Sequence, residues 1–265
     1  MSMRIVATTI LVTLVSASAS VLAKELQHHE GGNASHNHGH EIHWGYAGKA
    51  GPEHWGELKE EFSTCNVGMR QSPIDVNAGV RIKTNLSNIK FDYKKVKGEV
   101  INNGHSIQVN YPAGSSINID GEKYKLLQFH FHTPSENIVA GKHYDMEMHL
   151  VHENDKGELA VVAVFMKNGK HNKQLQSTWD IMPPKAGQKA MLTSAIFAGD
   201  LLPKDQTYTR FNGSLTTPPC SEGVSWFVMT NPIEVSEKQI AKFASVIGKD
   251  ARPVQAINHR FVLGN

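Results

Sequence analysis

Residues 126–132 read Leu-Leu-Gln-Phe-His-Phe-His, and this stretch is the most informative for fold and function. Its polar and apolar side chains alternate, which is typical of a β-strand, because successive side chains of a strand point to opposite faces. Gln128, His130 and His132 therefore share one face of the strand. The alternate residues are expected to pack on the opposite face, namely Leu127, Phe129 and Phe131.

A second stretch, Met-Glu-Met-His-Leu-Val at residues 146–151, repeats the pattern and places Glu147, His149 and Val151 on one face. Residues 133–142 contain Pro134 and Gly141 and can form the turn that brings the two strands together antiparallel. In that arrangement His149 completes a group of three imidazoles.

Three neutral imidazoles and one solvent molecule are the ligand set of an open, catalytic zinc site, whereas closed structural sites favour four protein ligands. We therefore predict that His130, His132 and His149 bind Zn²⁺. Gln128 and Glu147 are candidate acceptors for the ring N–H groups that face away from the metal. Two further histidines are expected to lie outside the group, because one points to the opposite face and the other is about 20 Å away along an extended strand; they are His152 and His143.

Short runs of β-branched and aromatic residues, separated by Gly, Pro and Asn, predict a mainly β fold with short peripheral helices in a single domain. The sheet is expected to be large and mostly antiparallel. The expected strands are 106–111, 123–131, 145–152, 159–166 and 224–229, and the expected helices are 173–180 and 236–246.

The amino terminus predicts an exported protein. Residues 1–23 combine Arg4, an apolar run and small residues, as a cleaved signal peptide does. Residues 24–43 carry six histidines among Gly, Asn and Ser, and this composition predicts a flexible segment. It is either a solvated linker or a weak metal-gathering segment. Residues 44–265 are expected to form the catalytic domain.

Charge and hydropathy exclude several classes of partner. The 27 Lys and Arg nearly balance the 25 Asp and Glu, and they are scattered, so no nucleic-acid surface is expected. No stretch has the roughly 20 apolar residues of a membrane span. A small neutral substrate fits this balance better. Only Cys65 and Cys220 are present, and in an oxidising compartment they are expected to form a disulfide, the alternative being a zinc site made by the two cysteines.

Several motifs together resemble the alpha carbonic anhydrases. Beyond the two histidine strands, the resemblance includes Gly213-Ser-Leu-Thr-Thr-Pro-Pro-Cys220 and Asn102-Asn-Gly-His105, and it covers nearly the whole mature chain in order. The remaining matching stretches are 44–46, 51–55, 71–74 and 252–253.

The resemblance implies a ten-stranded, mostly antiparallel central sheet with zinc on the three histidines, and Gln128 and Glu147 orienting two of them. It implies catalytic roles for Thr216 and Glu136, which would orient zinc-bound hydroxide toward carbon dioxide. His105 would export the proton. Side chains that would hold or border the waters of the proton path are Tyr46, Asn103 and Gln108, and those that would form the substrate pocket are Val151, Val161, Leu215, Thr217, Val224 and Trp226.

The implied activity is the reversible, zinc-dependent hydration of carbon dioxide to bicarbonate and a proton, the reaction of a carbon–oxygen lyase. The resemblance also implies a disulfide between Cys65 and Cys220, as in exported bacterial relatives, and a homodimer. The periplasm is the expected location, with secretion as the alternative. Two other functions stay open at this point: a binding module that keeps the fold without catalysis, and a zinc-scavenging protein whose histidine-rich segment is its main functional part.

Overall fold

The computed structural model describes residues 43–77 and 80–264. The predicted signal peptide and residues 24–42 of the histidine-rich segment lie outside these ranges. Within the described residues no helix is long and apolar enough to span a membrane.

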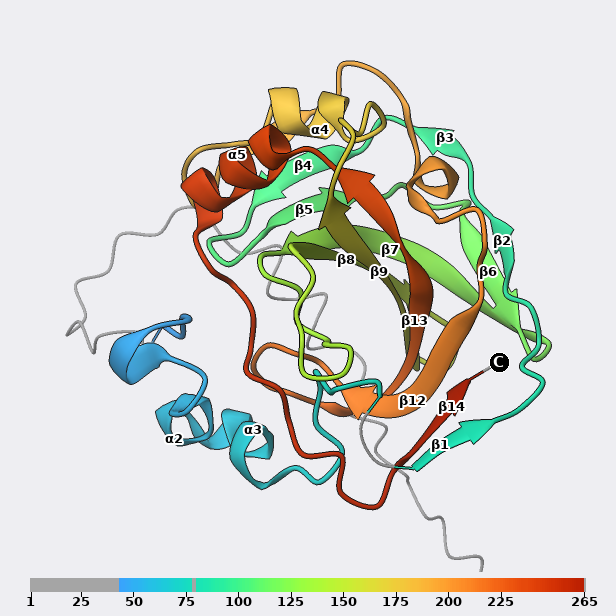
Figure 1. Cartoon of the computed structure of the whole chain (residues 1–265). Helices are drawn as coiled ribbons and strands as arrows, with labels where there is room; N and C mark the ends of the chain where they lie inside the picture. Colours follow the sequence, from blue (N-terminus) through green and yellow to red (C-terminus); the bar gives the residue numbers. More distant parts are fainter. Residues whose placement is uncertain (1–42, 78–79, 265) are drawn as a thin grey trace, which may run out of the picture. The chain divides into compact units, whose positions relative to one another are not determined.

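Strands dominate the structure, and the helices are short (Figure 1). The helical elements are η1 (Gly48–Ala50), α2 (Trp55–Leu58), η2 (Glu60–Phe62), α3 (Thr64–Val67), α4 (Gln176–Asp180), η3 (Ala198–Leu201) and α5 (Glu237–Ile247). The strands are β1 (Val80–Lys83), β2 (Lys90–Asp92), β3 (Lys95–Val96), β4 (Glu99–Asn102), β5 (Ile107–Asn110), β6 (Ser116–Ile119), β7 (Glu122–His132), β8 (Met146–Glu153), β9 (Leu159–Asn168), β10 (Lys189–Met191), β11 (Ile196–Phe197), β12 (Tyr208–Ser214), β13 (Glu222–Val235) and β14 (Phe261–Gly264).

The main sheet follows the order β1-β14-β12-β13-β9-β8-β7-β5-β4-β10. These ten strands agree with the expected sheet, and β2 and β6 extend it to twelve beside β7. Most neighbours are antiparallel, whereas β13 pairs parallel with β9 and β1 pairs parallel with β14. The mainly β, mostly antiparallel prediction is confirmed.

The central strands separate two apolar clusters, which explains why β8 and β9 are buried on both faces. Along β9, Val162 and Val164 belong to the larger cluster, while Val161, Ala163 and Phe165 belong to the smaller one. This alternation follows the two-residue period of a strand. Because both faces of β8 are covered in the same way, its polar face, which carries Glu147 and His149, is buried as well.

One packing prediction for β7 is wrong. Phe129 and Phe131 are fully buried as expected, but Leu127 is 38% exposed. The pairing of β7 with β8 shifts register between Leu126 and Gln128. This bulge places an extra residue on β7, so Leu127 leaves the strict alternation.

Strand β13 is longer than expected. The expected strand ended at residue 229, ahead of Asn231 and Pro232, and proline cannot donate to a sheet ladder. The pairing of β13 with β9 instead shifts register between Met229 and Ile233, and the strand continues to Val235. The irregularity accommodates the proline.

The two predicted helices are present, and they lie next to each other (Figure 1). Helix α5 begins at a capping box formed by Ser236 and Gln239, close to the predicted start. Helix α4 begins three residues later than expected, because the Asn172 side chain accepts a hydrogen bond from the backbone of Gln174 at 3.1 Å and holds the chain in a turn there.

Candidate metal centre

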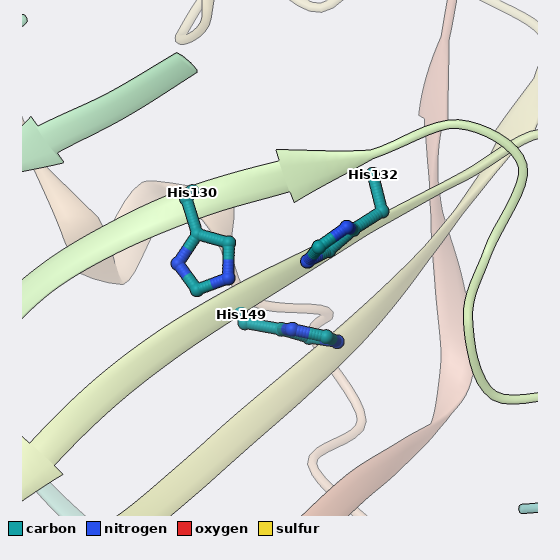
Figure 2. A group of neighbouring side chains, drawn as sticks. All are labelled: His130, His132 and His149. Carbon is teal, nitrogen blue, oxygen red and sulfur yellow. The ribbon is translucent and has the colours of Figure 1, made fainter. Parts of the chain in front are cut away.

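Three imidazoles converge from β7 and β8 (Figure 2). His130 pairs directly with His149 across the two strands, and His132 follows two residues later on the same face of β7. One ligand atom from each residue lies within 4.8 Å of the other two. The strand pairing that the sequence predicted thus brings the three predicted ligands together.

Hydrogen bonds fix which nitrogen of each ring faces the centre. His130 Nδ1 lies 2.9 Å from Gln128 Oε1, and His132 Nδ1 lies 2.8 Å from the carbonyl oxygen of Asp250. Amide and carbonyl oxygens only accept hydrogen bonds, so each Nδ1 carries the proton and each Nε2 keeps its lone pair. In His149 it is Nε2 that faces a protein group, a carboxylate oxygen of Glu147 at 3.2 Å without hydrogen-bond geometry, and Nδ1 lies 3.9 Å from Glu136 Oε2.

The donor set fits a zinc ion. His132 Nε2 is buried and has no hydrogen-bond partner among the described residues. Burial, with a smaller contribution from neighbouring imidazoles, holds the pKa of His130 and of His149 well below its usual range. Neutral imidazoles with free lone pairs are zinc ligands, and three of them leave a coordination position for solvent or substrate.

Glu147 is held rigidly behind His149. Its two oxygens accept hydrogen bonds at 2.8 Å from the backbone and the side-chain amide of Asn137. Burial raises the pKa of Glu147 to about 7, and the hydrogen bonds from Asn137 act in the opposite direction. The sequence analysis selected Glu147 but not Asn137.

Glu136 is completely buried beside the histidines. Its Oε2 lies 3.5 Å from His132 Nε2 and 3.9 Å from His149 Nδ1, and its Oε1 accepts the backbone N–H of Arg252 at 2.9 Å. Burial raises the pKa of Glu136 to about 8, against hydrogen bonding from the Arg252 backbone and the Thr216 side chain. Oε2 itself has no hydrogen bond of good geometry within the described chain. A cation bound at the histidines would favour the ionised form of this carboxyl.

Thr216 lies in the loop between β12 and β13, and it is buried. The loop is closed by two backbone hydrogen bonds, from Leu215 to Ser221 at 2.9 Å and from Cys220 to Thr217 at 2.8 Å. A disulfide joins Cys220 to Cys65, as expected. The bond ties this loop to helix α3.

A cavity of about 130 Å³ opens from the metal-binding face. Two metal ligands, His130 and His132, line it. The lining also includes the residues that the resemblance assigned to proton export, and Thr217, which it assigned to the substrate space. The full lining is Trp44, Tyr46, Asn103, His105, Ser106, Gln108, Gln128, His130, His132 and Thr217. Asn103 and Gln108 are joined by a hydrogen bond of 3.4 Å. The structure therefore brings all of these predicted residues to one space.

His105 occupies a stacked position in this lining. Its ring lies 3.5 Å from the ring of Trp44, centroid to centroid, with the planes 9° apart, and 4.9 Å from that of His43 at 22°. Burial, and to a smaller extent the charge of His43, lower the pKa of His105 to about 4.

The predicted substrate pocket is largely one apolar cluster. Val151, Val161, Val224 and Trp226 belong to the smaller core cluster, and Leu215 packs against it. The Trp226 ring lies 4.9 Å from the His149 ring in an edge-on contact. The apolar wall and the metal-binding face are thus adjacent.

Three residues of the centre were missed by the sequence analysis. Asp250 holds His132, Asn137 holds Glu147, and the backbone of Arg252 holds Glu136. Asp250 and His132 are 118 positions apart, and Arg252 and Glu136 are 116 apart. No local pattern marks such partners, because the contacts exist only once the chain is folded. The two histidines predicted to lie outside the group do so: His152 contacts Tyr93, and His143 contacts the carbonyl of Ser135.

Comparison with known proteins gives a consistent result. Residues 50–265 match the family described as eukaryotic-type carbonic anhydrase. A carbonic anhydrase of Klebsiella pneumoniae is 50% identical over 224 residues, which cover 83% of this chain and 90% of that protein. Among solved structures, the alpha-carbonic anhydrase of Thermovibrio ammonificans in complex with the inhibitor sulfanilamide matches with a TM-score of 0.82 and 46% identity, covering 84% of this chain and 99% of that one. The alpha-carbonic anhydrase of Photobacterium profundum matches with a TM-score of 0.78 and 48% identity over 83% and 99% of the two chains.

Proposed function

Because this chain belongs to the alpha, or eukaryotic-type, carbonic anhydrase family and is a carbonic anhydrase, we propose that it hydrates carbon dioxide reversibly with Zn²⁺ held by His130, His132 and His149. The observation that carries the proposal is the convergence of three imidazoles, with free lone pairs, beside a cavity and an apolar wall. When bound, zinc acts as a Lewis acid and lowers the pKa of a coordinated water to about 7, a figure established for carbonic anhydrase itself.

The residues behind the ligands keep the imidazoles in a metal-binding state. Gln128 and Asp250 accept the Nδ1 protons of His130 and His132, and Glu147 faces Nε2 of His149. Each contact fixes the ring orientation and leaves the other nitrogen free. The ligand set is therefore held in place before any metal arrives.

Thr216 and Glu136 orient the nucleophile in this proposal. A hydroxyl can donate one hydrogen bond and accept others. If Thr216 donates to the Glu136 carboxylate, its oxygen is left to accept a hydrogen bond from the nucleophile, which fixes the direction of attack. Support comes from the burial of both residues and from the effect of the Thr216 side chain on the pKa of Glu136.

Carbon dioxide is nonpolar, and an apolar wall can hold it without competition from water. The cluster of Val151, Val161, Val224 and Trp226 supports this role, together with Leu215 and with Thr217 at the cavity. Each turnover also releases a proton. We assign its export to His105, because its imidazole is a base that lines the cavity. Tyr46, Asn103 and Gln108 border the water path.

We further propose that the protein is exported to the periplasm or secreted, and that it forms a homodimer. The disulfide supports an oxidising compartment. The homodimer is proposed from the resemblance to bacterial members of the family. Sedimentation of the mature protein over a range of concentrations tests the dimer.

Stopped-flow hydration of carbon dioxide, measured together with bound zinc, tests the central proposal. The wild-type protein is expected to carry one zinc per chain and to hydrate rapidly, and His149→Ala is expected to lose both. His171→Ala, at an exposed histidine, is the matched control and should retain both. Zinc retained by His149→Ala would contradict the ligand set, and zinc without hydration in the wild type would contradict the catalytic roles.

A further inference from the structure

A second cavity, of about 410 Å³, lies beside the paired strands β12 and β14 (Figure 1). No described residue lines both this cavity and the one at the metal-binding face. The cationic side chains of its lining are Arg70, Arg210 and Arg260, and the apolar ones are Phe211, Phe261 and Leu263. Every ionisable side chain in the lining is therefore an arginine.

Strand pairing explains how charge and apolar surface come together here. Arg210 of β12 pairs directly with Leu263 of β14. Phe261 lies two residues before Leu263, so both point to the same face of β14. Phe261 is 57% exposed, which is unusual for so large an apolar side chain. The cavity thus combines an uncovered apolar surface with a neighbouring cation.

Arg260 is fixed in position at this cavity. Its guanidinium donates three hydrogen bonds to backbone carbonyls, at 3.0, 3.1 and 2.7 Å, and the acceptors are Ile257, Asn212 and Ala256. It also lies over the Phe211 ring, 6.0 Å from the ring centroid. A guanidinium has five N–H groups, so two of them stay available to a ligand.

The other two arginines each have one carboxylate partner. Arg70 Nε lies 3.3 Å from Glu222 Oε2, and Arg210 Nη1 lies 2.6 Å from Asp120 Oδ2. Neither carboxylate lines the cavity. Three guanidinium groups and two carboxylates leave this set with one net positive charge.

Two of the arginines are close enough to repel each other. Burial lowers the pKa of Arg260, the carboxylate of Glu222 acts against this, and the charge of Arg70 adds to the lowering. A bound anion near both groups offsets their repulsion, because it attracts each of them.

We propose that this cavity binds a small organic monoanion, a carboxylate or sulfonate carried on a flat apolar body. The anionic head contacts the guanidinium groups of Arg70 and Arg260, which suit planar or multidentate oxyanions. The apolar body covers Phe261 and Leu263. A neutral apolar ligand leaves the guanidinium groups without an anion, and an inorganic anion leaves Phe261 exposed, so both halves of the ligand are needed.

Two fluorescent probes with similar bodies test the two halves. Anilinonaphthalene sulfonate carries the anionic head, and phenylnaphthylamine lacks it. In fluorescence titrations of the full-length, zinc-loaded protein, the sulfonate should bind at one site per chain and about 10-fold more tightly than the neutral probe, as expected for hydrogen bonds to a charged group. Equal affinity for the two probes would overturn the proposal.

Arginine variants test the head. Arg70→Gln and Arg210→Gln should each weaken binding of the sulfonate by about 5-fold, the size of a partly exposed ion pair, and the double variant by about 25-fold if the two effects are independent. Binding of the neutral probe should not change. Arg210→Lys keeps the charge and should stay within about 2-fold of the wild type. Lys242→Gln, which removes an exposed charge outside the lining, is the matched control. Wild-type affinity for the sulfonate in the double variant would overturn the proposal.

Phe261→Ala tests the body. It should weaken binding of both probes by about 5-fold, because part of the apolar contact is lost. Met191→Ala is the matched control, since Met191 is 61% exposed and does not line the cavity. Unchanged affinities in Phe261→Ala would show that the apolar body lies elsewhere and would contradict the site.

The pH dependence of binding separates this cavity from the metal centre. Sulfonate and guanidinium groups keep their charges between about pH 7.5 and 9, so the affinity should stay constant. An anion on the metal competes with bound hydroxide and weakens by roughly 10-fold per pH unit above about pH 7. Such a decrease would place the probe at the metal and overturn the proposal. None of these measurements uses hydration of carbon dioxide, so their failure leaves the proposed function untouched.

Discussion

Histidines occur on both faces of the same pair of strands, and their surroundings differ. On one face, His130, His132 and His149 converge beside a cavity with free ring nitrogens. On the other face, the His152 ring is enclosed between the Tyr93 hydroxyl at 2.9 Å and the Ala160 carbonyl at 3.2 Å. The carbonyl accepts the Nδ1 proton of His152, and Nε2 accepts from Tyr93, so both nitrogens are satisfied.

These contacts indicate that a buried histidine is a metal ligand only where the fold leaves one ring nitrogen without a protein partner. His149 and His152 are three residues apart on β8, and both are fully buried or nearly so. Their chemistry is set by what faces each ring. The predictions that follow test whether the two faces behave as differently as their contacts indicate.

Metal removal should produce the largest difference in Tm shift between variants of the two faces. A ligand that binds only the folded state stabilises it by about 4 kcal/mol when its concentration is a thousand times its Kd. Chelation should therefore lower the Tm of the wild type and of His152→Gln by similar amounts. His149→Ala should show no such shift. Calorimetry with and without chelator measures this, and a chelator-independent Tm in the wild type would contradict the comparison.

Acid should destabilise the protein through His152, on the opposite face. Burial lowers the pKa of His152 from 6.5 to about 4, so the unfolded chain takes up this proton at a higher pH than the folded protein does. The stability from neutral His152 is complete above about pH 6.5 and is lost as the pH falls toward 4, about 3 kcal/mol in all.

The variant His152→Gln tests this linkage, because glutamine can bond to both neighbours without titrating. Denaturant unfolding between about pH 5 and 8 should give a shallower pH dependence for the variant. Other groups titrate in this range as well, so the difference between the two proteins is the quantity to compare. Equal slopes would show that folding leaves the pKa of His152 unchanged, which would contradict the lowered value.

Glu136→Gln should have an intermediate effect. The substitution keeps the shape of the side chain but removes the charge, so the proposed hydrogen bond from Thr216 weakens. Hydration should fall by roughly 10- to 100-fold, the range found for outer partners of metal sites, while bound zinc remains. Full activity in this variant would contradict the proposed orientation of the nucleophile.

Gln128→Ala should have the smallest effect of the four. It removes the acceptor of the His130 Nδ1 proton at 2.9 Å, and a neutral acceptor forms a weaker hydrogen bond than a charged one. We expect zinc affinity to fall about 10-fold, at the lower end of the range for such partners. Competition with a chromogenic chelator measures it, and Gln128→Glu, which restores an acceptor, should recover the affinity.

The strands that carry the metal ligands could be predicted because their pattern is local. The two-residue alternation of 126–132 and 146–151 identified the shared face, and the short connection identified the partner strand. The local pattern did not predict two features that depend on tertiary contacts. One is the bulge that exposes Leu127 within β7, and the other is the irregularity that lets β13 continue past Pro232. The roles of Thr216, Glu136 and His105 depended on resemblance to a family, since none of them lies in a pattern that specifies its chemistry.

By itself, the sequence determined which side chains share a face and that three imidazoles can meet, because strand periodicity and a short turn are properties of neighbouring residues. Only the tertiary structure decided that Asp250 and Arg252 close the centre from more than a hundred positions away. It also decided that His43 lies against His105. The physical reason is that hydrogen bonds and ring contacts act over a few ångströms in space, whatever the separation along the chain.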